Sequence, residues 1–140
     1  MHKYILTFLA ATSILFNSCT NGQTQTTNTN LSATEFSEKI KELPSAPVVD
    51  VRTPEEFTKG HLENALNYNW NGSDFQKQIS TLDKSKPVFV YCLSGGRSSS
   101  AANQMRSDGF KEVYELSGGI TKWRAANLPE TTTNTTHQQE

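Results

Sequence analysis

The 140-residue sequence is poor in cysteine, in apolar residues and in clustered positive charge. Its two cysteines, Cys19 and Cys92, have such different surroundings that we expect no structural disulfide between them. One cysteine in the main body and scattered histidines cannot form a conventional zinc site, and no segment has the spacing of a metal, nucleotide or flavin motif. Net charge is −1 without a basic patch, which argues against a nucleic-acid partner. We therefore expect no cofactor and no nucleic acid.

A long hydrophobic run is also missing. The most apolar segment, Tyr4–Phe16, has thirteen residues and follows a short start that contains Lys3. It is too short to span a bilayer as a stable helix and matches the hydrophobic region of a secretory signal. Ser18 before Cys19 resembles the end of a bacterial lipoprotein signal, although Leu15 lies one place early for that pattern. Ordinary secretion with cleavage elsewhere is the alternative.

The lipoprotein interpretation makes residues 1–18 a signal peptide and Cys19 a diacylated mature N-terminus. The protein would then be exported and anchored to a bacterial membrane by this lipid alone, with its domain facing the periplasm. The rest of residues 19–30 contains only Thr, Asn, Gln and one Gly, which predicts a flexible tether because no apolar surface offsets the ordering entropy. Residues 131–140 have a similar composition, which predicts a disordered tail.

The remaining residues, 31–130, are enough for one domain with its own core. Apolar periodicity, capping residues and turn signals predict its elements. The expected helices cover about 33–42, 54–59, 74–82, 98–108 and 120–128, and the expected strands cover about 47–52, 65–69, 88–92 and 112–116. Strands that alternate with helices predict an α/β domain with a mainly parallel sheet and helices on both faces.

The segment Val88–Ser98 organises the rest of this domain. A β-branched and aromatic strand ends at Cys92, a short loop with two glycines follows, and a helix then begins. Backbone N–H groups converge at such a loop, and the helix dipole adds partial positive charge. A thiol placed there ionises easily, and the site attracts anions. The alternative is a buried, inert thiol at a strand end.

Three separated segments carry a resemblance to a known family. Cys92–Ser98 is similar to the active-site loop of single-domain rhodaneses, which are thiosulfate and persulfide sulfurtransferases. Segments within Asp50–Asn67 resemble the family's first signature, and Gly109–Trp123 resembles its C-terminal signature. The similarity covers residues 31–129 in the family's order and spacing.

This resemblance implies a rhodanese-like fold for residues 31–130 and catalysis through a persulfide on Cys92. The thiolate would take the outer sulfur of thiosulfate or a persulfide and pass it to a thiol or cyanide acceptor. The chain would act as a monomer. The loop residues whose backbone N–H groups would cradle the sulfur and bind substrate are Leu93, Ser94, Gly95, Gly96 and Ser98.

Four charged or titratable side chains near this loop have competing interpretations. The guanidinium group of Arg97 can hold an oxyanion such as thiosulfate or stabilise loop carbonyls. The alternative is a solvated arginine at a helix N-terminus, where the helix dipole disfavours a cation. Asp50 and Arg52 share a face of their strand, and both could reach the active loop. We favour a supporting role in which they form salt bridges that anchor neighbouring loops; the alternative is that Arg52 contacts substrate. His61 is interpreted as part of the turn after a helix rather than as a base.

The length of the loop helps to separate possible reactions. Cys92 to Arg97 spans six residues, whereas rhodanese relatives that act on phosphate or arsenate esters have loops one residue longer, which suit a tetrahedral oxyanion. Six residues favour sulfur as the attacked atom. The alternative function is a persulfide carrier, or a redox or sulfide-sensing adaptor, that does not turn over.

Overall fold

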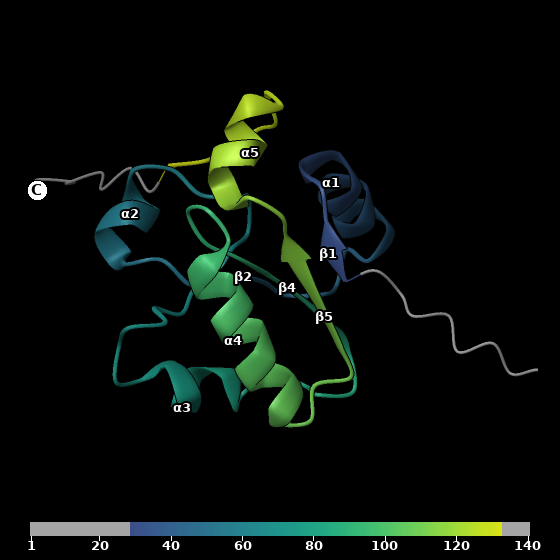
Figure 1. Cartoon of the computed structure of the whole chain (residues 1–140), viewed down its shortest axis with the longest axis vertical. Coiled ribbons are helices and arrows are strands. Elements are labelled where there is room, and N and C mark those ends of the chain that lie inside the picture. The colour runs from purple at the N-terminus through teal and green to yellow at the C-terminus, as the bar shows by residue number, and fades with distance from the viewer. Residues whose placement is uncertain (1–28, 133–140) are drawn as a thin grey trace, which may run out of the picture.

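Residues 29–132, which the computed structural model describes, alternate between strands and helices (Figure 1). The strands are β1 (Asn30–Leu31), β2 (Val48–Asp50), β3 (Leu66–Asn67), β4 (Pro87–Tyr91) and β5 (Glu112–Leu116). The helices are α1 (Ala33–Glu42), α2 (Pro54–Thr58), α3 (Phe75–Ile79), α4 (Gly96–Ser107) and α5 (Gly119–Ala125).

The strands form one sheet in the order β1-β5-β4-β2-β3, and every neighbouring pair is parallel. The predicted parallel α/β class is therefore confirmed. Because all strands run the same way, the segments that follow β2, β4 and β5 meet at one edge of the sheet. Ligands bind at this edge in open parallel sheets.

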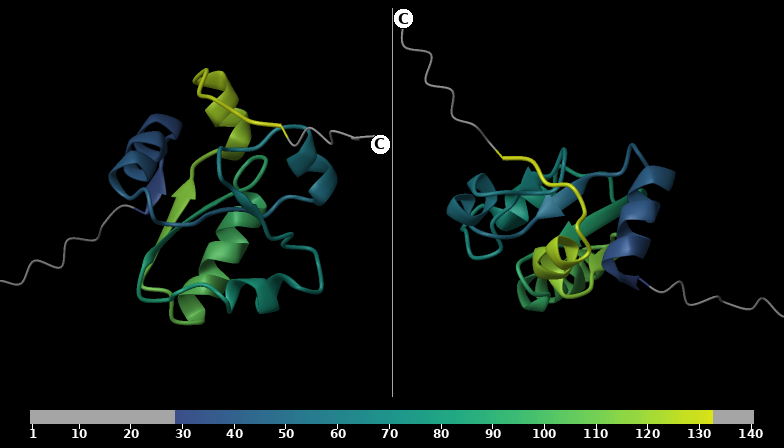
Figure 2. Two further views of the ribbon diagram at one scale, coloured as in Figure 1. Left: turned by 180° about the vertical axis from the view of Figure 1, so that it is seen from behind. Right: turned by 90° about the horizontal axis from the view of Figure 1, so that it is seen from above.

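Alternation along the central strand β4 divides the core into two layers. Val88 and Val90 pack with side chains of α3 and α4, whereas Phe89 and Tyr91 pack with side chains of α1 and α5. Figure 1 shows α4 on the near side of the sheet, and Figure 2 shows the same elements from behind and from above. Helices thus cover both faces, as the sequence predicts.

Two helices begin as their local sequence predicts. At α1, the Ser32 hydroxyl accepts the backbone N–H of Glu35, and the Glu35 carboxylate accepts the backbone N–H of Ser32. At α2, Thr53 and Glu56 form the same reciprocal pair, with Pro54 at the first helical position. Each capping box satisfies backbone donors that a helix start otherwise leaves without partners.

Several element boundaries differ from the predictions. Helix α3 ends at Ile79, because the Ser80 and Thr81 hydroxyls bond back to carbonyls in its last turn. Leu82 nevertheless packs against the core. Helix α4 begins at Gly96, two residues before the predicted start. The short strand β1 was not predicted.

The ends of the domain also extend slightly beyond the expected limits of 31 and 130. Asn30 belongs to β1, which pairs with β5, so the predicted tether is ordered at its last residue. Thr131 forms an antiparallel bridge with His61, so the predicted tail is paired at its first residue. The predicted signal peptide, Cys19 and residues 133–140 lie outside the described residues. No helix within 29–132 is long and apolar enough to cross a membrane.

Candidate active site

The chain turns sharply between β4 and α4 (Figure 1). Cys92 directly follows the strand, and Gly95 closes the turn with φ +110°, a backbone conformation that side chains with a Cβ rarely adopt. Its carbonyl accepts the N–H of Ser99, which starts the helical bonding of α4. Of the two loop glycines, Gly95 therefore makes the turn and Gly96 is already helical. Propensity alone treats both as loop residues, which explains the predicted late start of α4.

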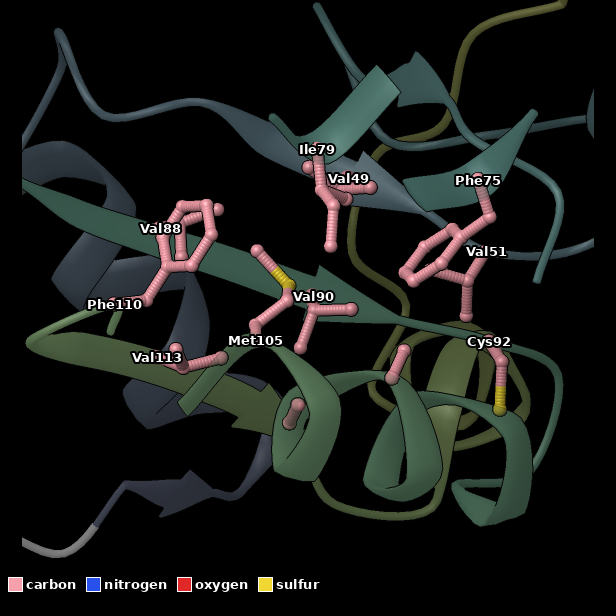
Figure 3. Close-up of a cluster of buried hydrophobic side chains, with 12 residues drawn as sticks. Val49, Val51, Phe75, Ile79, Val88, Val90, Cys92, Met105, Phe110 and Val113 are labelled. Atoms are coloured by element: carbon pink, nitrogen blue, oxygen red, sulfur yellow. The ribbon is translucent and has the colours of Figure 1, made fainter. Parts of the chain in front are cut away.

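Hydrogen-bond donors surround the Cys92 sulfur at this turn. The Gly95 N–H donates to Sγ at 3.1 Å, and the Ser98 hydroxyl lies 3.4 Å from Sγ. Figure 3 shows the sulfur pointing toward the start of α4 from the end of the apolar cluster. The whole residue is only 1% exposed, so these donors act in a largely dry environment.

These donors decide the ionisation of the thiol. Burial by itself raises the pKa of Cys92, but hydrogen bonds outweigh it. The Ser98 hydroxyl contributes most, followed by the backbone N–H groups of Ser98, Gly95 and Ser94. Because each donor stabilises the thiolate more than the thiol, the pKa of Cys92 lies below its ordinary value. The geometry therefore provides an activated sulfur nucleophile.

Helix α5 fixes the other side of the same turn. The Ile120 N–H donates to the Cys92 carbonyl at 2.9 Å, and both the N–H and the hydroxyl of Thr121 donate to the Leu93 carbonyl. Gly119 makes this approach possible, since a Cβ there would lie 2.5 Å from both carbonyl oxygens. The first turn of α5 thus holds the loop backbone while the loop's own N–H groups face the sulfur.

Arg97 does not project freely into solvent. Its two terminal nitrogens bond both carboxylate oxygens of Glu56 on α2, at 2.7 and 2.8 Å. The Arg97 hydrogen bonds are the main reason that the pKa of Glu56 falls to about 2. The same bonds raise the pKa of Arg97, and the Cys92 charge makes a smaller contribution in the same direction. The arginine is therefore electrostatically close to the sulfur, but its fork is occupied by a carboxylate.

Asp50 and Arg52 bond each other and the chain after α2. They form a buried ion pair with an N–O distance of 2.6 Å, and Arg52 also bonds the Gly60 carbonyl after α2. In the sheet, Asp50 of β2 lies opposite Tyr91 of β4. The Tyr91 side chain belongs to the core layer on one face of the sheet, and Cys92 belongs to the layer on the other face. The pair ties the end of β2 to the end of α2.

The other predicted site residues are placed as follows. Leu93, Ser94 and Gly96 are exposed on the turn around Cys92. The ring of His61 stacks on Phe57 and bonds the Phe57 carbonyl, which agrees with a structural role. Within residues 29–132, no cluster of three acidic, histidine or cysteine side chains could hold a metal ion.

Two residues contribute to the site beyond those that the sequence singles out. Glu56 lies in the first turn of α2, shortly after β2, at the edge of the sheet that carries Cys92. Gly119 begins α5 shortly after the last strand. A pair of glycines directly after the last strand is a usable signal for close backbone approach, since glycine alone tolerates it.

The domain is α/β, with a cysteine of lowered pKa between a central parallel strand and a helix start. The chain belongs to the rhodanese-like domain family, which matches residues 32–126. Among solved structures, a rhodanese-related protein of Thermoplasma volcanium has a TM-score of 0.64 at 27% identity and covers 73% of this chain and 96% of its own. The rhodanese-like domain of the Anabaena Alr3790 protein has a TM-score of 0.66 at 27% identity, covering 80% and 87%.

Similar curated proteins include several with an assigned activity in their names. A Coxiella burnetii protein named thiosulfate sulfurtransferase GlpE is 40% identical over 78 residues, which are 56% of this chain and 71% of that protein. A Shewanella oneidensis protein of the same name is 34% identical over 89 residues, or 64% and 86% of the two chains. The family and its sulfurtransferase relatives thus agree with the expectation from the motifs.

Proposed function

We propose that this protein is a sulfurtransferase that carries a sulfane sulfur on Cys92. The observation that carries the proposal is the position of Cys92 Sγ, which accepts hydrogen bonds from Gly95 and Ser98 at the start of α4. Such preorganised donors stabilise first the thiolate and then an anionic persulfide of similar charge. The names of the GlpE relatives point to thiosulfate as one donor.

The reaction divides into two displacements. The Cys92 thiolate attacks the outer sulfur of thiosulfate, the S–S bond of the donor breaks, and its electron pair leaves with sulfite. An acceptor thiolate or cyanide then attacks the outer sulfur of the Cys92 persulfide. The S–S bond of the persulfide breaks, the acceptor keeps the outer sulfur, and the Cys92 thiolate is restored. Each step conserves charge and needs no separate oxidant, metal or organic cofactor.

Turnover with the full chain tests this function. Thiosulfate and cyanide should yield thiocyanate in many-fold excess over protein, and Cys92→Ser should yield none while its unfolding curve stays cooperative. Ser99→Ala is a control at an exposed position of the first turn of α4 and should retain activity. Thiocyanate production by a folded Cys92→Ser protein would refute the proposed nucleophile.

One observation favours a second candidate, a persulfide carrier. Cys92 is almost fully buried, so a bound sulfur would be shielded from solvent. A carrier would take up one sulfur per chain from a donor and release it only to a particular acceptor thiol. Stoichiometric loading without thiocyanate turnover would select this candidate over the enzyme.

We also propose that the domain is exported and anchored through a lipid on Cys19. The support is the sequence of the leader alone. Expression in a bacterial host with a radiolabelled fatty acid should label the protein and place it in the membrane fraction. Cys19→Ser should lose both the label and the membrane association; a labelled Cys19→Ser protein would contradict the anchor.

A further inference from the structure

The pairing of Arg97 with Glu56 changes the charge that the site offers to a donor. Arg97 is the sole charged residue of the loop, and each of its two terminal nitrogens donates to a carboxylate oxygen of Glu56. Such a pair is geometrically strong because two parallel charge-assisted bonds form at once. A donor that approaches Cys92 therefore meets a carboxylate together with the cation.

Three other described cations of the surrounding elements, Arg52, Arg124 and Lys122, do not replace Arg97. Arg52 is paired with Asp50, and Arg124 is paired with Glu130. Lys122, on the first turns of α5, is exposed, so solvent screens its charge. With the thiolate present, the group formed by Cys92, Arg97 and Glu56 has a net charge of about −1, since one cation faces two anions.

We propose that Glu56 determines donor specificity by cancelling the charge of Arg97, so that the site favours donors of low negative charge over dianionic thiosulfate. This inference rests on the proposed sulfur transfer at Cys92 and names the donor class of that same site. A thiol persulfide, whose transferable group carries one negative charge, fits the class. Thiosulfate then becomes a donor that reacts despite repulsion from Glu56.

Glu56→Gln is a conservative test of this role. Glutamine can still accept the Thr53 backbone N–H and preserve the capping box of α2, while it removes the negative charge beside Arg97. Glu115→Gln is the matched control, because Glu115 pairs with Arg106 at the far end of the same helix α4. Both variants lose one arginine–carboxylate pair, but only one of the pairs borders Cys92.

Two donors of nearly the same shape separate charge from geometry. Methanethiosulfonate has the sulfone and terminal sulfur of thiosulfate but carries one negative charge instead of two. Because Coulomb energy scales with donor charge, Glu56→Gln should raise kcat/KM about tenfold for thiosulfate and about threefold for methanethiosulfonate. Glu115→Gln should leave the ratio of the two values unchanged. Equal changes for the two donors, or a loss with both, would overturn the proposal.

A binding measurement separates this proposal from sulfur transfer itself. Sulfate and methanesulfonate are unreactive analogues, and their protection of Cys92 against iodoacetamide requires no transfer. We expect sulfate to protect Cys92 more strongly in Glu56→Gln than in the wild type, without a comparable gain for methanesulfonate. This result supports the charge effect even if the protein transfers no sulfur. Unchanged protection by sulfate would refute the role of Glu56 whether or not the wild type transfers sulfur.

Discussion

The Ser98 hydroxyl makes the largest contribution to lowering the pKa of Cys92. Its single proton is shared between two acceptors, Cys92 Sγ and the Gly95 carbonyl. A thiolate attracts that proton more strongly than a neutral carbonyl does, so ionisation of Cys92 strengthens the bond that favours it. Ser98 thus links the start of α4 to the reactivity of the sulfur.

Ser98→Ala should therefore raise the pKa of Cys92, because loss of a donor destabilises the thiolate and leaves the opposing effect of burial. At neutral pH the thiolate fraction falls, and alkylation by iodoacetamide should slow about tenfold, the scale of one hydrogen bond to a charged group. The pH dependence of the alkylation rate measures both effects. Ser100→Ala, which loses only a bond to the Gly96 carbonyl, is the control. An unchanged pH profile in Ser98→Ala would contradict this role.

Arg97→Ala should weaken transfer from thiosulfate more than transfer from methanethiosulfonate. The substitution leaves the Glu56 carboxylate beside the site without its cation, so a dianion is repelled more than a monoanion. We expect a loss of about tenfold or more in kcat/KM for thiosulfate and a smaller loss for the monoanion. Initial rates with the two donors give the comparison, and equal losses would show that Arg97 does not respond to donor charge.

Two helices, α4 and α5, contact the Cys92 loop and hold its backbone in place. Helix α4 supplies donors to the sulfur, and α5 supplies donors to the carbonyls of Cys92 and Leu93. The α5 donors hold these carbonyls turned away from the sulfur. If the carbonyls faced the sulfur, their negative ends would repel a thiolate. Close contact between α5 and the loop is therefore a condition for the electrostatics of the site.

Gly119→Ala should disrupt the contact between α5 and the Cys92 loop. A Cβ would meet the Cys92 and Leu93 carbonyl oxygens at 2.5 Å, and φ +60° at Gly119 disfavours a side chain. We expect a loss of about 2–3 kcal/mol in the free energy of unfolding, with sulfur transfer reduced further than stability alone accounts for. Urea denaturation measures the first effect. Gly96→Ala, where nothing lies within 4 Å of the added Cβ, is the control for stability. Equal stability of the two variants would contradict the close approach of α5.

Elements with local signals could be predicted from the sequence. The capping residues Ser32 and Thr53 mark the starts of α1 and α2, and the β-branched run before Cys92 marks β4. Elements that depend on distant partners could not. Strand β1 has two residues and exists because β5 offers it a parallel edge, which no local pattern in a polar segment reveals.

The same distinction applies to the site. The position of Cys92 and the turn that follows it are local, so strand, glycine and helix signals locate them. The contact of Arg97 with Glu56 joins residues 41 positions apart, and its geometry depends on how α2 is seated by Asp50, Arg52 and Gly60. Sequence reasoning could therefore place a cation near the sulfur but not the carboxylate that cancels it.

On the scale of the whole domain, the parallel topology brings all of these groups to one edge. Segments after β2, β4 and β5 contribute Glu56, the Cys92 loop and the first turn of α5, although they are far apart in the chain. The two core layers hold the strands from both faces, so the edge is formed by short connections on a rigid sheet. This is the arrangement in which parallel α/β proteins place their reactive groups.

The most direct test of sulfur transfer is the intact mass of the full chain after brief exposure to excess thiosulfate, and again after addition of cyanide. We predict that the wild-type chain gains one sulfur atom and loses it to cyanide with formation of thiocyanate, and that folded Cys92→Ser gains none under the same conditions. Because Cys19 remains in both proteins, the comparison assigns the sulfur to Cys92. Uptake of sulfur by Cys92→Ser, or no uptake by the wild type from thiosulfate, methanethiosulfonate or a thiol persulfide, would contradict the account.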